Sequence, residues 1–121
     1  MRFYQAAKPY IDEKLTKASE ATKRCEYDKG FAMLEDAHVI GQQSTYFHTL
    51  VHFWMLQHGL WLRDYKEVLR QLFRLIGALT KTALGLIPAG NTGGANVNPC
   101  KPMSVSQQNQ AILAKIKHAQ S

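Results

Sequence analysis

The sequence predicts an all-α protein: two antiparallel helical hairpins, then a loop rich in Gly, Asn and Pro, and a short C-terminal helix. Apolar residues recur every three or four positions along most of the chain, which is the spacing of one helix face. No segment alternates apolar and polar residues with the period of two that marks a strand. The 121 residues are enough for one domain with a core, so we expect a single helical domain over residues 1–121.

The first hairpin is predicted from two helical stripes. The first helix runs from about Tyr4 to Cys25, and Pro9 falls inside it, so this helix either begins or kinks at the proline. The second helix runs from Asp28, a residue type that favours the N-cap, to Gly41. A short polar turn at residues 42–44 then reverses the chain.

The second hairpin opens with a helix that carries no formal charge, from Ser44 or Thr45 to Leu62. Its length raises the question of a membrane span, but three histidines lie within it, and hydrocarbon penalises such side chains. We therefore expect no membrane span but a central helix buried on most sides, with both of its tryptophans in the core. The next helix begins behind Asp64, a second N-cap residue, and continues to Leu84.

The segment from Gly85 to Pro102 is rich in Gly, Asn and Pro, which predicts an irregular connection. Because it is longer than most loops in compact domains, we expect it to pack across the mouth of the hairpin. A short amphipathic helix from Ser106 to about His118 follows it. The first four helices can assemble as a four-helix bundle or as a short stack of hairpins, and the bundle is preferred.

The composition is that of an ordinary globular protein. Fifteen basic and nine acidic residues give a formal charge of +6, which attracts anions mildly but is not the balance of a dedicated nucleic-acid binder. Several basic residues gather on the helix after Asp64, and we interpret them as a solvated face. The two cysteines, Cys25 and Cys100, lie far apart, and the N-terminus shows no export signal. We therefore expect a cytoplasmic protein.

Four side chains near the first turn carry the strongest chemical signal. Glu35 and His38 are three residues apart, and His48 and His52 are four apart, so each pair shares one face of its helix. If the chain reverses at Gln43, the two pairs come level across one antiparallel seam. Three imidazoles and a carboxylate are a suitable ligand set for a divalent transition metal such as zinc, iron or nickel.

Other polar residues near this set are interpreted differently. Asp36 points about 100° away from Glu35 around the helix, so we expect a solvated carboxylate. His58 lies on another face of its helix, and Glu67 should lie far from His52, although it could serve as a fifth ligand. No nucleophile stands in a recognisable catalytic motif, so enzymatic activity is left open. The alternative to a metal site is a protein-interaction module with structural histidines and no metal.

Two stretches resemble tetratricopeptide-type helical hairpins. Residues 27–37 resemble the second helix of such a repeat, and residues 56–65 resemble the turn region of the next one. Three repeats are normally needed for a stable array, and only about two fit here. The resemblance implies two stacked hairpins and a surface for a protein partner.

A second resemblance covers most of the chain. The stretch Leu34–Gln42, the pair His48 and His52, and Thr80–Val97 with its Gly-Asn-Thr-Gly-Gly-Ala-Asn run resemble a bacterial family of small proteins, domain of unknown function family 3703. That family has no assigned activity. Its members tend to be encoded near heavy-metal efflux systems, so the resemblance implies metal handling. The matching residues that could bind a metal are Glu35, His38, His48 and His52.

Overall fold

The computed structural model describes residues 2–81 and 105–121, and all regular secondary structure in this part of the chain is helical, without a strand. The predicted all-α class is therefore confirmed. Short turns join the first four helices, and residues 82–106 lie between the fourth and the fifth. The helices are α1 (Phe3–Lys23), α2 (Tyr27–Gly41), α3 (Thr45–Trp61), α4 (Tyr65–Lys81) and α5 (Gln107–Gln120).

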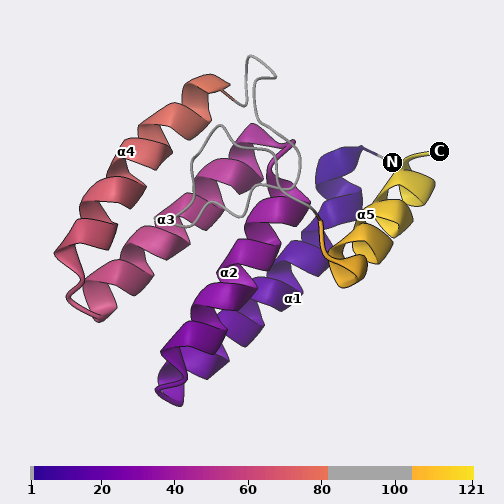
Figure 1. The fold of residues 1–121 in the computed structure, drawn as a ribbon. Coiled ribbons are helices and arrows are strands. Elements are labelled where there is room, and N and C mark those ends of the chain that lie inside the picture. Colours follow the sequence, from indigo (N-terminus) through magenta and orange to yellow (C-terminus); the bar gives the residue numbers. More distant parts are fainter. Residues whose placement is uncertain (1, 82–104) are drawn as a thin grey trace.

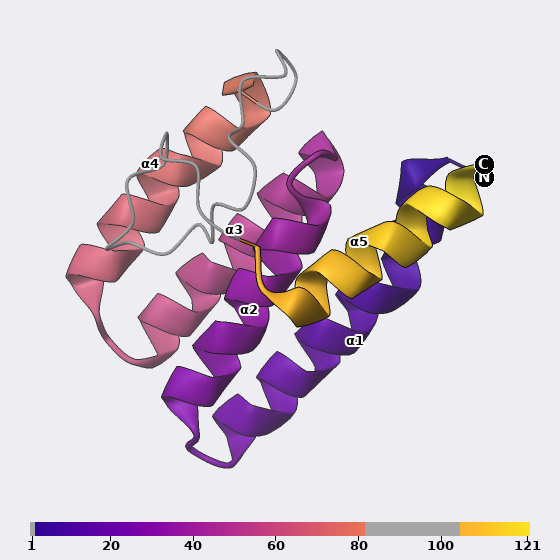
Figure 2. The ribbon, with the colours of Figure 1, turned by 45° about the vertical axis from the view of Figure 1, so that its right-hand side comes forward.

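The helices follow one another in space much as they do in the chain. α1 and α2 form one antiparallel hairpin, α3 and α4 form the other, and α2 packs against α3 (Figure 1). α5 lies across α1 and α2, as the turned view in Figure 2 shows. α1 and α4 stand on opposite sides of this array and share no main interface. The arrangement is thus closer to a short stack of hairpins than to the preferred closed bundle.

The core lies between α1, α2, α3 and α5. Its largest fully buried apolar side chains include Ile11 on α1, Leu34 and Ile40 on α2, Phe47 on α3 and Ile116 on α5. Within the described residues, α4 adds no apolar side chain to this buried cluster. No helix in this part of the chain is long and apolar enough to cross a membrane.

Two of the predicted helix starts are confirmed and one is wrong. The Ser44 hydroxyl accepts a hydrogen bond from the Phe47 N–H at 3.3 Å, and the Asp64 carboxylate accepts one from the Glu67 N–H at 3.2 Å. Asp28, however, is not an N-cap, because α2 already begins at Tyr27. The chain reverses earlier than predicted, since Cys25 adopts a left-handed φ of 61°.

Other expectations about the chain have mixed outcomes. α1 continues through Pro9, so it does not begin there. Trp61 is 67% exposed and is not a core residue, whereas Trp54 packs partly buried against the core. The predicted helix end at Leu84 and the predicted cover formed by Gly85–Pro102 lie outside the described residues.

Gly41 allows the close approach that places the histidines. A Cβ at this position would lie 2.8 Å from Phe47 Cβ and 2.9 Å from Ile11 Cδ1, so any larger residue would push the helices apart. α2 therefore ends tightly against α1 and the first turn of α3. His38 lies one turn before this crossing point, and His48 lies in the first turn of α3.

Candidate metal centre

The three predicted histidines meet inside the α2–α3 interface. His38 comes from α2, and His48 and His52 lie one turn apart on α3. Each is at least 96% buried, and their ring centroids are separated by 4.7 to 4.8 Å. One ring nitrogen from each histidine lies within 4.8 Å of the other two. Three buried imidazoles in such a triangle are an arrangement that can hold a metal ion.

The fourth predicted ligand stands apart from this triangle. Glu35 is half-buried on α2, one turn before His38, and it is not part of the group of convergent ligand atoms. His58 is also outside the group, as expected, and its Nε2 donates to the backbone carbonyl of Tyr27 at 3.1 Å.

Asp36 turns away from the histidines, but it is not solvated as predicted. It lies between α1 and α5, where one carboxylate oxygen accepts from the Lys14 ammonium at 3.2 Å. The other oxygen accepts from the Asn109 amide at 3.1 Å. The expectation was wrong because it ignored α5, whose position depends on packing rather than on the local sequence of α2.

A hydrogen-bonded chain from α4 orients His52. The Gln71 Nε2 donates to the Glu67 carboxylate at 2.9 Å, and Gln71 Oε1 lies 2.8 Å from His52 Nδ1. Because a carboxylate only accepts, Glu67 fixes the amide so that its oxygen faces the imidazole. His52 therefore carries its proton on Nδ1, and its Nε2 keeps a lone pair. At metal sites, a histidine ligand typically donates its other ring N–H to an acceptor in this way.

The two histidines of α3 already stand at a ligand-like separation. His48 Nε2 and His52 Nε2 are 3.1 Å apart, and in the metal-free protein His48 donates the hydrogen bond, since His52 Nε2 has the lone pair. Two nitrogens bound at about 2.0–2.1 Å to a tetrahedral ion stand roughly 3.3 Å apart. A shift of the His48 proton to Nδ1 would leave both Nε2 lone pairs facing one point.

Burial keeps these imidazoles neutral. It lowers the pKa of His48 to about 3, with a further lowering by the charge of His52. Burial also lowers the pKa of His52 to about 4, and the positive charge of nearby Arg74 lowers it further, whereas the hydrogen bond that His52 donates to Gln71 raises it. Metal ligation requires a neutral imidazole, and these two side chains are already neutral near neutral pH. Neither of them therefore has to release a net proton when a metal binds.

Sequence reasoning missed the contribution of α4. Gln71 is fully buried, and Arg74 is half-buried near His52 instead of belonging to a solvated basic face. Glu67, considered as a fifth ligand far from His52, reaches that ring through Gln71. One signal was present: Glu67 and Gln71 are four residues apart, the spacing of a side-chain pair on one helix face.

Comparison with known proteins identifies a family. The family described as "Protein of unknown function (DUF3703)" matches residues 5–113, which is most of the chain. Neither the curated proteins nor the solved structures gave a match. The match includes all three histidines of the triangle as well as Gln71 and Glu67. The chain therefore belongs to the DUF3703 family of proteins of unknown function.

Proposed function

We propose that this protein binds one divalent transition metal ion through His38, His48 and His52. The observation that supports it is the convergence of three buried imidazoles, one of which is oriented by a glutamine. Imidazole nitrogen is a borderline ligand that suits zinc, iron or nickel. Zinc fits best, because it takes three protein ligands and a fourth partner in tetrahedral geometry.

Glu35 is the proposed fourth ligand. It lies one turn before His38 on the same helix, so a change of side-chain rotamer is the movement that would bring its carboxylate closer. Glu35→Gln is the matched test, because it removes the charge and keeps the size. We expect it to weaken zinc binding while three imidazoles remain bound; unchanged affinity would assign the fourth position to water.

A zinc titration of untagged, chelator-treated protein tests the proposal. We expect one zinc ion per chain by calorimetry. A ligand that binds only the folded state stabilises it by about 2.7 kcal/mol at a hundredfold excess over the dissociation constant. The melting temperature should therefore rise by several degrees with zinc and return after chelation. A melt that neither zinc nor chelator moves would contradict the proposal.

A helical interaction module is the second candidate function, and the outer face of α4 favours it. Five large side chains there are 47–76% exposed within the described structure, namely Tyr65, Leu69, Leu72, Phe73 and Ile76. Rows of exposed apolar residues often mark interaction sites. If chelator and zinc leave the melt unchanged while α4 variants abolish partner binding, this second function replaces the first.

A further inference from the structure

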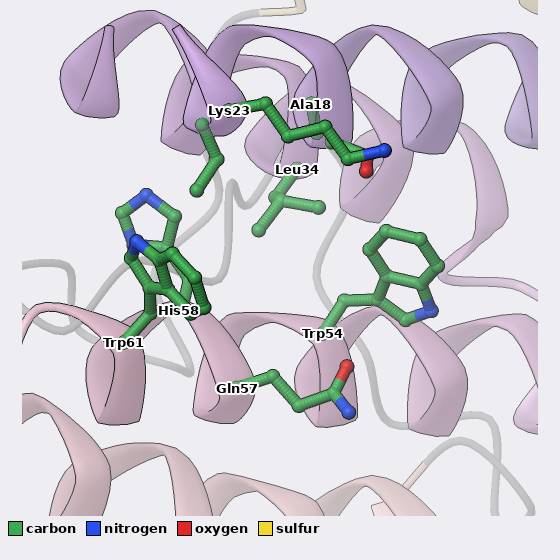
Figure 3. A pocket seen from close by; sticks show the side chains of 9 residues that line it. Ala18, Lys23, Leu34, Trp54, Gln57, His58 and Trp61 are labelled. Carbon is green, nitrogen blue, oxygen red and sulfur yellow. The ribbon is translucent and has the colours of Figure 1, made fainter. Parts of the chain in front are cut away.

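A cavity of about 320 Å³ lies between the first hairpin and α3, and residues of α1, α2 and α3 line it. Its volume is at the lower end of the range for small-molecule pockets. Figure 3 shows α1 and Leu34 of α2 on one side and the side chains of α3 on the other. Leu34 lies one turn before His38, so the cavity is next to the histidine triangle but shares none of its three histidines.

Two indoles form the aromatic part of the wall. Trp54 and Trp61 are the only tryptophans of the chain, and both line the cavity from α3. They lie on either side of it in Figure 3, with Ala18 and Leu34 between them on the opposite wall. Trp61 is 67% exposed, so its indole has unused apolar surface beside the opening. Such walls favour a flat, apolar body that packs against aromatic rings.

The charge of the lining favours an anion. Lys23, the last residue of α1, extends along the cavity in Figure 3. It makes no ion pair with any residue in the described ranges, and it is the one cation among the described residues that line the cavity. Burial lowers the pKa of His58 despite its bond to the Tyr27 carbonyl, so His58 adds no charge near neutral pH.

We infer that this cavity binds a small aromatic anion, an aryl carboxylate or sulfonate, with its ring between Trp54 and Trp61 and its charged group on Lys23. Polar groups of Ser19, Thr22 and Gln57 also line the cavity and can bind further oxygen atoms of the ligand. This site does not depend on the proposed metal function, because none of the three histidines takes part in it.

The test uses 1-anilinonaphthalene-8-sulfonate and its uncharged counterpart, N-phenyl-1-naphthylamine. Because both tryptophans line the cavity, binding should quench tryptophan fluorescence and give energy transfer to the dye. Lys23→Gln should weaken binding of the sulfonate about tenfold, since a hydrogen bond to a charged group is lost, and should spare the neutral amine. Lys17→Gln, on the same helix but outside the cavity, should change neither.

A filling variant tests the location independently. Ser19→Trp places an indole into the cavity and should block both dyes, provided that circular dichroism shows an intact fold. The inference is overturned if Lys23→Gln and Ser19→Trp both leave sulfonate binding unchanged. It is also overturned if Phe73→Ser on the exposed face of α4 abolishes that binding, or if Lys23→Gln weakens both dyes equally. Absence of dye binding at millimolar concentration would contradict it as well.

Discussion

Helix α2 carries two buried polar clusters on nearly opposite faces. Asp36 faces α1 and α5, whereas His38, two residues later and about 200° around the helix, faces α3. The first cluster joins opposite charges: the Lys14 side chain is 96% buried, and its ammonium lies 3.2 Å from the Asp36 carboxylate. The second cluster gathers three chemically identical bases.

The contrast separates a structural cluster from the proposed metal site. In the first cluster, the Asp36 carboxylate pairs with the opposite charge of Lys14 and accepts a hydrogen bond from Asn109. These contacts join α1, α2 and α5. In the second, burial lowers the pKa of His48 and His52, which is the cost of placing bases in a poorly solvated site. Perturbed groups of this kind gather at functional sites. Substitutions in the two clusters should therefore affect different properties.

The largest expected effect is the loss of metal binding when a triangle histidine is removed. His48→Ala and His52→Ala should each weaken zinc binding by more than about 100-fold, because loss of even an outer-shell partner costs about 10–100-fold. His58→Ala is the matched control on the same helix and should keep its affinity. Calorimetry measures all three; equal binding by the three variants would remove the basis for the triangle as a metal site.

The second effect is on stability. Asp36→Ala should lower the free energy of unfolding by about 3 kcal/mol, because it leaves the buried Lys14 charge without its partner. Zinc affinity should not change. Asp12→Ala is the control, since its pair with Lys8 is half-exposed and should matter little. Urea denaturation measures the difference, and similar losses in the two variants would contradict a structural role for the Asp36 cluster.

The third effect concerns the support from α4. Gln71→Leu should weaken zinc binding about 10–100-fold, because His52 then loses the group that holds its tautomer and orientation. Gln108→Leu, an exposed position on α5, should have no effect on affinity. If both variants bind zinc like the parent protein, the chain from Glu67 through Gln71 is structural only.

The smallest effect is a pH dependence of the metal-free fold. The pKa values of His48 and His52 are about 3 and 4 in the folded protein, below the ordinary 6.5, so the unfolded chain binds more protons between these values. Their contribution to stability is complete above about pH 6.5 and is lost as the pH falls toward 4. Between pH 7 and pH 6 the free energy of unfolding should fall by about 1 kcal/mol. In urea denaturation, a double His48→Gln, His52→Gln variant should lack this loss, and retention of the full slope would contradict buried neutral histidines.

The sequence predicted much of the fold because local signals were strong. Apolar spacing marked the helices, and Ser44 and Asp64 marked two of their starts correctly. The meeting of His38, His48 and His52 was predictable because a short turn sets the register of α2 against α3. Asp28 failed as a cap because the conformation of Cys25 moved the turn.

The features that the sequence did not predict depend on which face each helix turns toward its neighbours. On α4, Leu69 and Phe73 are 68% and 76% exposed, whereas the polar Gln71 is fully buried against α3. An apolar pattern predicts the opposite orientation, so the supporting residues of the site were missed. The position of α5, and with it the partner of Asp36, follows from packing between segments far apart in the chain.

X-ray absorption at the zinc edge of untagged, zinc-loaded protein measures whether the three histidines bind the ion. We expect a four-coordinate ion with nitrogen ligands at about 2.0–2.1 Å and a scattering signature of three imidazoles. His52→Ala should reduce that signature to two. A spectrum without imidazole scattering, or one that is identical in the parent protein and in His52→Ala, would contradict a metal centre at His38, His48 and His52.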